Sequence, residues 1–213
     1  MKQAKNPELN YRSNEDETRA SSLFDLQFVE DELHHLQANI VPQESKVVFC
    51  HNDILAANVM MLPETGNVQL IDFEYGGVNF AAFDIANHFN EWAGGTDDGV
   101  PDYSMFPDEE ERIGFITEYL RVLQATNVDL NGSDKAEEQP GDNEEKVEDE
   151  RILKEVHALA KEVDAFLLVN HLYWGLWAVN QGKTEGCEDF DYFLYASNRF
   201  AQYRITKDDT ASG

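Results

Sequence analysis

Three short apolar runs rich in β-branched residues lie close together in the first third of the chain, and they constrain the fold most strongly. Residues 46–50 (KVVFC) are predicted to form a buried strand. Residues 59–62 and 68–71 flank the stretch 63–67 (PETGN), whose glycine and asparagine suit a tight turn. These two runs therefore predict a β-hairpin beside the first strand.

Apolar residues at helical spacing predict helices on both sides of this small β cluster. The expected helices cover residues 22–41, 78–93, 109–125, 152–181 and 191–205. Ser22 is predicted to cap the first helix, with Asp25 three residues later, and Pro42 to end it. Gly175 is a candidate break in the fourth helix. One helix, a β cluster and then several helices predict a mostly helical α+β fold.

The chain of 213 residues is expected to form one domain over residues 22–206. We expect residues 1–21 to be a frayed or disordered lead-in and residues 207–213 to be a tail, because neither has a hydrophobic period. Residues 129–150 carry ten acidic residues against two lysines. Such a composition predicts a flexible, solvated insertion without secondary structure.

The net charge of −26 argues against nucleic acid or an anionic lipid surface as the main ligand, because both would be repelled. A small cation would be attracted. Cys50 and Cys187 are the only cysteines and form no metal-binding motif, so neither a disulfide framework nor a zinc site is expected. No apolar run reaches the roughly 18 residues of a membrane span. We therefore do not expect an integral membrane protein, and we expect a cytoplasmic location.

Asp53, Asn58 and Asp72 form the first group of candidate catalytic residues. Each lies at the end of a predicted strand or in the loop that leaves it. Phosphoryl transfer needs a carboxylate that accepts the proton of the attacking hydroxyl and oxygen ligands for Mg²⁺. Any one of the three would also suit a turn or a cap, but their spacing around a hairpin favours a phosphotransferase site. His51 is expected to support the loop from behind.

Acidic and aromatic side chains form the second group. The candidates on one face of the helix at 78–93 are Asp84, Asn87 or His88, and Glu91. Trp174 and Trp177 lie three residues apart on a predicted helix, and Tyr192 and Tyr195 follow on the last one. Aromatic faces with a carboxylate can bind a small organic cation. The alternative for the tryptophan pair is simple core packing.

Three stretches of the sequence resemble the choline/ethanolamine kinase family, which has a protein-kinase-like fold. They are VVFCHNDILAANVM, LIDFEYGGVNFAAFDIANHFNEW and LYWGLWAVNQ. The resemblance covers residues 23–205 apart from the acidic insertion. It implies ATP-dependent phosphorylation of ethanolamine or choline with Mg²⁺, the first step of phosphatidylethanolamine and phosphatidylcholine synthesis.

The resemblance also implies roles for individual residues. Asp53 would be the catalytic base, and Asn58 and Asp72 would bind Mg²⁺. Asp84 would accept hydrogen bonds from amides of the catalytic loop. The amino-alcohol pocket would be lined by Tyr75, Glu91, Trp174, Trp177 and Tyr195, with Glu91 pairing with the substrate nitrogen.

The sequence departs from the family pattern at its start. No phosphate-covering glycine loop and no strand-borne lysine precede residue 22, so we expect a C-terminal lobe without the N-terminal β-lobe and with weak or no activity alone. An inactive pseudo-kinase lobe that acts as an interaction module is one alternative function. A kinase for another small hydroxylated molecule is a second. The stretch FNEWAG slightly favours ethanolamine over choline, and a homodimer stays open.

Overall fold

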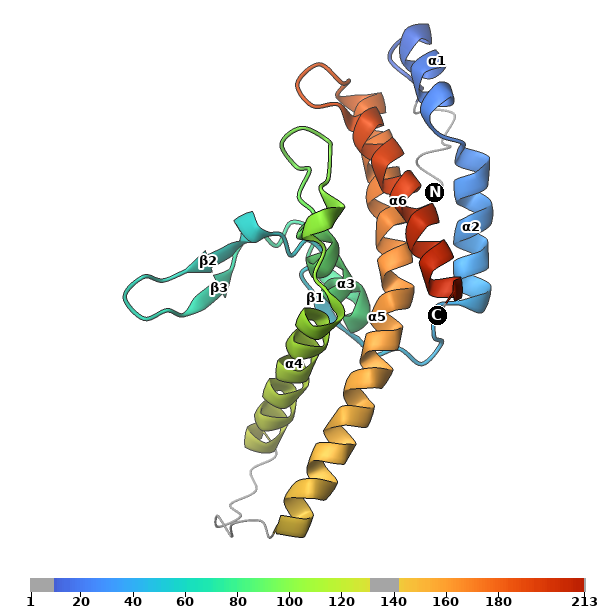
Figure 1. Cartoon of the computed structure of the whole chain (residues 1–213). Coiled ribbons are helices and arrows are strands. Elements are labelled where there is room, and N and C mark those ends of the chain that lie inside the picture. The colour runs from blue at the N-terminus through green and yellow to red at the C-terminus, as the bar shows by residue number, and fades with distance from the viewer. Residues whose placement is uncertain (1–9, 131–141, 213) are drawn as a thin grey trace. The chain divides into compact units, whose positions relative to one another are not determined.

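The computed structural model of the chain describes residues 10–130 and 142–212, and it is mostly helical with two small sheets (Figure 1). The chain divides into two compact units, one made of residues 1–106 and 163–213 and the other of residues 107–162. The single domain expected over residues 22–206 stays a prediction. None of the helices in the described ranges is long and apolar enough to cross a membrane.

The first unit begins with two helices, α1 (Asn14–Leu23) and α2 (Leu26–Asn39). Ser13 caps α1 by accepting from the Asp16 amide, so residues 14–21 are helical and not frayed as predicted. Asp25, and not Ser22, caps α2, since its carboxylate accepts from the amides of Gln27 and Phe28. Residues 1–9 of the expected lead-in lie outside the described residues.

Four strands form two antiparallel pairs in the first unit: β1 (Val47–Cys50) with β4 (Gly77–Phe80), and β2 (Val59–Met61) with β3 (Val68–Leu70). The predicted hairpin at 59–71 is confirmed. The prediction of helix directly after Gly77 was wrong, because residues 77–80 pair with β1 before the helix begins. The prediction of a buried β1 was wrong too, because Phe49 is 67% exposed on the open face of a two-stranded sheet.

Helix α3 (Ala81–Glu91) follows β4, and the short 3-10 helix η2 (Tyr103–Met105) lies at the end of the first of the two segments that form this unit. The second unit contains α4 (Glu109–Leu130) and the first part of α5 (Asp142–Thr184). Residues 142–150 were expected to be flexible but are helical, while residues 131–141 lie outside the described part. Within this unit, Gln124 donates a hydrogen bond to Glu155 at 3.1 Å.

Helix α5 runs without a break through Gly175, where the sequence suggested one. Instead, the missing side chain makes room for a neighbour: a Cβ on Gly175 would lie 2.3 Å from Cε1 of Phe200 on α6. Helix α6 (Tyr192–Ser212) extends through most of the predicted tail, so the tail expected at 207–213 was wrong for residues 207–212. Both glycine positions at this crossing, Gly175 and Gly182, face a phenylalanine ring of α6.

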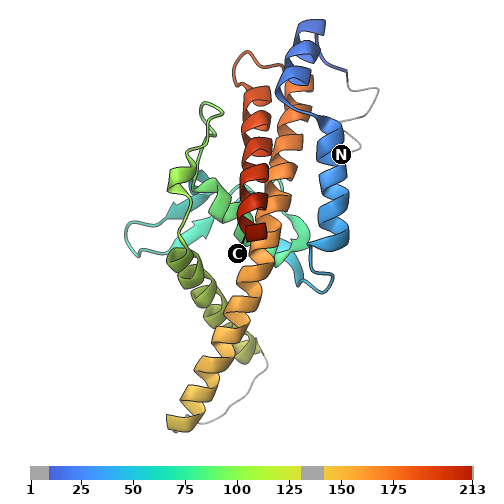
Figure 2. The ribbon, with the colours of Figure 1, turned by 45° about the vertical axis from the view of Figure 1, so that its right-hand side comes forward.

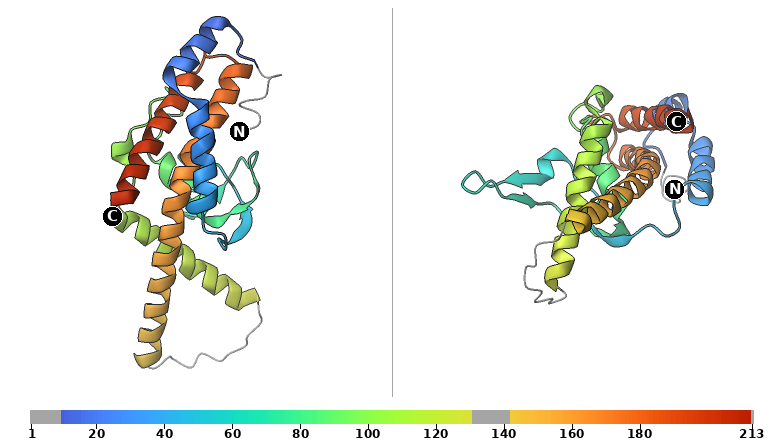
Figure 3. Two further views of the ribbon diagram at one scale, coloured as in Figure 1. Left: turned by 90° about the vertical axis from the view of Figure 1, so that its right-hand side faces the viewer. Right: turned by 60° about the horizontal axis from the view of Figure 1, so that its bottom comes forward.

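The core of the first unit lies where α2, α5 and α6 pack together. Figures 1 and 2 both show α6 beside the C-terminal part of α5, with α2 along the same pair. Leu36, Leu172 and Tyr203 are fully buried there, one from each helix. The β2–β3 hairpin projects away from these helices (Figure 3). This arrangement places the loops that leave the strands at the edge of the helical body.

Candidate active site

The loop after β1 is held by the side chain of Asp84, in the first turn of α3. Its Oδ2 accepts from the His51 amide at 2.8 Å, and its Oδ1 accepts from the Asn52 amide at 2.7 Å. Asn52 has a φ of 67°, a left-handed conformation that is unfavourable for most residues. The two hydrogen bonds that the charged Asp84 side chain accepts offset the free-energy cost of this conformation. Asp84 thus fixes the backbone directly before Asp53.

His51 supports the same loop through its ring. Its Nδ1 accepts from the Asp53 amide at 3.3 Å, so Nε2 carries the proton and donates to the Ile71 carbonyl at 2.8 Å. The ring also packs against Phe73, with centroids 4.6 Å apart. Both ring nitrogens are therefore occupied, Nδ1 within the loop and Nε2 at the residue that follows β3, and this agrees with the supporting role expected for His51.

Asp53 and Asn58 contact each other. Nδ2 of Asn58 donates to the backbone carbonyl of Asp53 at 3.0 Å and to its Oδ2 at 3.2 Å. Burial raises the pKa of Asp53, and nearby Glu74 and Asp72 add to the rise, while His51 and Asn58 oppose it. A carboxylate with a raised pKa is a better proton acceptor. Asp53 can therefore act as a base without losing its fixed orientation.

Asn58 and Asp72 lie at the same end of the hairpin. Val59 pairs with Leu70, and the Ile71 amide donates to the Asn58 carbonyl at 3.0 Å, so Asp72 follows directly beside Asn58. The amide oxygen of Asn58 and an exposed carboxylate are both hard oxygen ligands, as Mg²⁺ prefers. Among the described residues no group of three His, Cys, Asp or Glu side chains could hold a metal alone. The donor set therefore fits a magnesium ion that takes its other ligands from phosphates and water.

A cavity of ≈ 350 Å³ opens beside Asp53 in the first unit. Its aromatic lining consists of Tyr75, Trp174, Trp177, Phe190, Tyr192 and Tyr195. The two indoles meet edge to face with centroids 5.4 Å apart, and Trp177 donates from Nε1 to the Tyr75 hydroxyl at 3.1 Å. The rings are thus locked to one another rather than free to collapse into the space between them.

Three carboxylates, those of Asp53, Glu74 and Glu91, also line the cavity, and no basic side chain is among the residues that line it. Such a lining is attractive to a cation and repels an anion. Aromatic faces together with carboxylates are the usual surroundings of a bound ammonium group. The cavity therefore suits a small organic cation.

Glu91 does not stand alone in this lining. The sequence predicted that it pairs with a substrate nitrogen, but its Oε1 already accepts from Nη1 of Arg199 at 3.2 Å, and the two side chains are 5% and 0% exposed. Burial raises the pKa of Glu91, and Arg199 opposes that rise. Glu91 lines the cavity as half of a buried ion pair.

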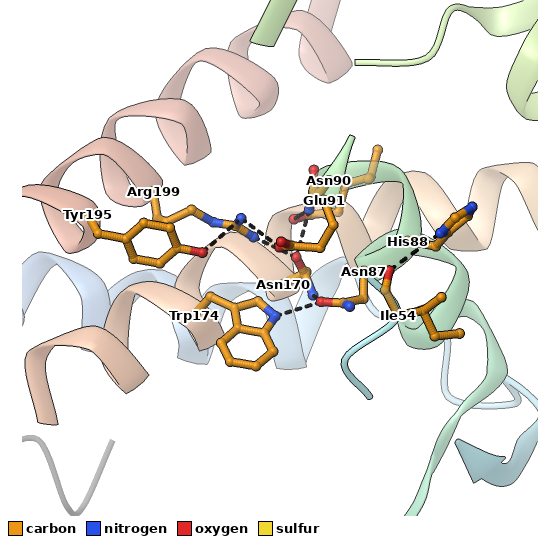
Figure 4. Close-up of polar contacts among 10 residues, drawn as sticks. Ile54, Asn87, His88, Asn90, Glu91, Asn170, Trp174, Tyr195 and Arg199 are labelled. Atoms are coloured by element: carbon orange, nitrogen blue, oxygen red, sulfur yellow. Dashed lines mark hydrogen bonds and ion pairs between the residues drawn. The ribbon is translucent and has the colours of Figure 1, made fainter. Parts of the chain in front are cut away.

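The structure brings all ten predicted site residues into the first unit, within the loops and helices around one cavity and the hairpin end. Of the alternatives on α3, Asn87 lies with Glu91 on the buried side, whereas His88 contacts the Ile54 carbonyl (Figure 4). Glu74, Phe190 and Arg199 were not predicted from the sequence. The glutamate directly precedes Tyr75 and could have been found, but no pattern around Arg199 marks it as the partner of a glutamate 108 residues away.

A family model described as "Choline/ethanolamine kinase" matches residues 1–204. The chain belongs to the choline/ethanolamine kinase family. The resemblance that the three sequence motifs indicated is thereby confirmed. Ethanolamine kinase 1 of Mus musculus is 38% identical over 177 residues, which cover 83% of this chain and 43% of that protein.

Two further comparisons agree with this family assignment. "Probable choline kinase 1" of Arabidopsis thaliana is 34% identical over 185 residues, or 85% of this chain and 46% of that protein. The solved structure of a Plasmodium vivax ethanolamine kinase matches with a TM-score of 0.69 at 26% identity, covering 93% of this chain and 45% of that one. The chain therefore spans less than half the length of each of these choline/ethanolamine kinases.

Proposed function

We propose that this member of the choline/ethanolamine kinase family uses the cavity beside Asp53 to phosphorylate the hydroxyl group of ethanolamine or choline with ATP. The observation that carries the proposal is that Asp53 and six aromatic side chains line the same cavity. An amino alcohol has a reactive hydroxyl at one end and a cation at the other. A carboxylate that can take a proton and aromatic faces that attract a cation match these two ends.

In this proposal Asp53 accepts the proton of the substrate hydroxyl as the hydroxyl attacks the γ-phosphoryl group. The hydrogen bond from Asn58 holds one carboxylate oxygen of Asp53 in place. Asp84 and His51 fix the backbone of the loop, so that the base does not have to be oriented during the reaction. Tyr75, Trp177 and their aromatic neighbours would hold the ammonium end.

Asn58 and Asp72 would hold Mg²⁺, and the bound metal would neutralise charge on the phosphates of ATP. We further infer that the chain corresponds to the C-terminal lobe of kinase-like enzymes, and its span of less than half the length of its relatives agrees with this inference. We expect such a lobe alone to bind an amino alcohol but to turn it over weakly, since positioning of the phosphates supplies much of the rate.

Ethanolamine is the substrate that we favour within the family. Its primary ammonium can donate three hydrogen bonds, and besides Asp53 two carboxylates, those of Glu74 and Glu91, line the cavity as acceptors. Choline offers no N–H donor and relies on the aromatic faces. A place at the first step of phospholipid head-group synthesis follows from either substrate. The cytoplasmic location expected from the sequence and the homodimer that the sequence left open both stay predictions.

The test compares the 213-residue chain with its Asp53→Asn variant. Transfer of phosphate from ATP to ethanolamine and to choline is measured with Mg²⁺ present, and binding of each amino alcohol is followed separately by tryptophan fluorescence. We expect binding of both amino alcohols to both proteins and transfer only by the unaltered chain. Circular dichroism checks that the variant keeps its helices.

Two results would contradict the proposal. If neither amino alcohol binds the unaltered chain at millimolar concentration, the cavity is not an amino-alcohol site. If Asp53→Asn transfers phosphate as fast as the unaltered chain, Asp53 is not the base. Weak transfer with clear binding is the result expected for a single lobe.

A further inference from the structure

A fully buried arginine lies behind the cavity. Arg199 on α6 donates from Nη1 to Glu91 at 3.2 Å and to the Tyr195 hydroxyl at 3.3 Å. Its Nη2 donates to Oδ1 of Asn170 on α5 at 2.7 Å. Figure 4 shows the guanidinium group between these partners. Two of the three, Glu91 and Tyr195, also line the cavity.

The hydrogen bonds continue from Asn170 to the other side of the cavity. Its Nδ2 donates to Oδ1 of Asn87 on α3 at 2.8 Å, and the same oxygen accepts from Nε1 of Trp174 at 2.6 Å. Nδ2 of Asn90 also donates a hydrogen bond to Oδ1 of Asn170 at 2.8 Å. The chain of contacts thus begins at one group that lines the cavity, the Glu91 carboxylate, and ends at another, the Trp174 indole (Figure 4).

Stability alone does not explain this network. A buried ion pair often contributes no more than apolar residues of the same volume, because both charges lose their hydration. Three asparagines (Asn87, Asn90 and Asn170) are 0% exposed within it, and each needs a defined partner. What the network does provide is geometry, since a continuous series of hydrogen bonds joins Glu91 to Arg199, Asn170, Asn87 and Trp174.

The second carboxylate oxygen of Glu91, Oε2, can bind a ligand in an orientation that depends on this network. Its Oε1 accepts from Arg199, and among residues 10–130 and 142–212 no hydrogen bond reaches its Oε2. That oxygen can accept from an N–H or O–H group of a molecule in the cavity. Without Arg199, burial would favour the protonated form of Glu91, because the effect that opposes the raised pKa would be gone.

We propose that Arg199 is a positioning residue of the amino-alcohol site, which orients the Glu91 carboxylate directly and the Trp174 indole through Asn170 and Asn87. This inference rests on the function proposed above. It implies that an ammonium group meets a carboxylate oxygen and an aromatic face whose separation is set by three helices rather than by the ligand. Ethanolamine depends more on the carboxylate than choline does, because only its ammonium can donate hydrogen bonds to Glu91.

Two substitutions test the network, with a matched control. Arg199→Lys keeps the charge but cannot reach the partners of both guanidinium nitrogens. Asn170→Asp still accepts from Arg199 but cannot donate to Asn87. The control is Tyr203→Phe, on the same helix and equally buried, which removes a hydrogen bond to Glu32 away from the cavity.

Dissociation constants of ethanolamine and choline are measured by tryptophan fluorescence on each 213-residue protein, below its melting temperature. We expect both network variants to bind ethanolamine at least about tenfold more weakly, with a smaller effect on choline. Tyr203→Phe should change neither constant by more than about twofold. A fall in melting temperature alone would not produce this pattern, because all binding is measured on folded protein.

Three results separate the possibilities. If either network variant folds and binds ethanolamine like the unaltered chain, Arg199 does not position the site. If both variants are unfolded even at 4 °C while Tyr203→Phe is folded, the network serves stability, and the proposal is also overturned. If the unaltered chain itself binds neither amino alcohol, the proposed function fails, and this outcome is distinct from the other two.

Discussion

The substitution Asp84→Asn should destabilise the protein far more than the same change at Asp25. Both aspartates accept from two backbone amides, but they do so differently. Asp25 uses the single oxygen Oδ1 for the amides of Gln27 and Phe28. Asp84 uses one oxygen for the His51 amide and the other for the Asn52 amide. An asparagine has only one oxygen, so it can replace Asp25 but not Asp84.

The expected magnitude follows from this geometry. In Asp84→Asn the new NH₂ group faces one of the two backbone N–H groups, and that donor loses its acceptor. A hydrogen bond to a charged group contributes about 1.5–3 kcal/mol, and the other bond is weakened to a neutral one. We expect a loss of about 3 kcal/mol in the free energy of unfolding. Asp25→Asn should cost less than about 0.5 kcal/mol, because asparagine is an equally good N-cap.

Urea unfolding of the unaltered chain and of both variants, followed by circular dichroism, measures the difference. The two variants carry the same change of charge, so a general electrostatic effect would move both equally. Equal free energies of unfolding for Asp84→Asn and Asp25→Asn would refute the reasoning. Such a result would mean that Asn52 keeps its left-handed backbone conformation without the Asp84 carboxylate.

Three more predictions concern packing, pH and the aromatic lining. Gly175→Ala should cost about 1–3 kcal/mol in urea unfolding, because its Cβ would collide with Phe200, whereas Gly114→Ala, with nothing within 4 Å, should be neutral or stabilising by up to about 1 kcal/mol. Burial lowers the pKa of His171 well below its usual 6.5. Below pH 6.5 the unfolded chain therefore binds more protons than the folded chain, and the free energy of unfolding should fall by up to about 1.4 kcal/mol for each unit that the pH is lowered. His171→Gln should lack this contribution to the pH dependence of the free energy of unfolding. Trp177→Ala should weaken binding of choline more than binding of ethanolamine in fluorescence titrations, and equal effects would indicate that the ring serves packing only.

Local patterns predicted the elements whose cause is local. The hairpin at 59–71 follows from its turn residues, and α4 follows from apolar residues at helical spacing. Strand β4 could not be predicted in the same way, because its partner lies about 30 residues earlier in the chain and the sequence of residues 77–80 continues smoothly into α3. Helix α1 has little apolar character, but its capping sequence, Ser13 followed by Asp16, is a signal that could have been used.

In the candidate site, too, residues within a local motif could be predicted and partners that are distant in the sequence could not. Asp53, Asn58 and Asp72 could be predicted because a short motif encodes their spacing around the hairpin. The buried partners of Glu91 could not, because Arg199 and Asn170 come from helices that meet only in the folded chain. Polar residues inside a helix-forming sequence do not reveal whether they face water or one another. Only the packing of α3, α5 and α6 makes these side chains a network.

The β1–β4 ladder gives the two ends of the proposed site a common origin. Cys50, the last residue of β1, pairs with Gly77, the first residue of β4. The chain leaves one strand toward Asp53, and it leaves the other into the helix that carries Glu91. A substitution that disrupts the four pairs of this ladder should therefore displace Asp53 and Glu91 together, although 38 residues separate them in the sequence.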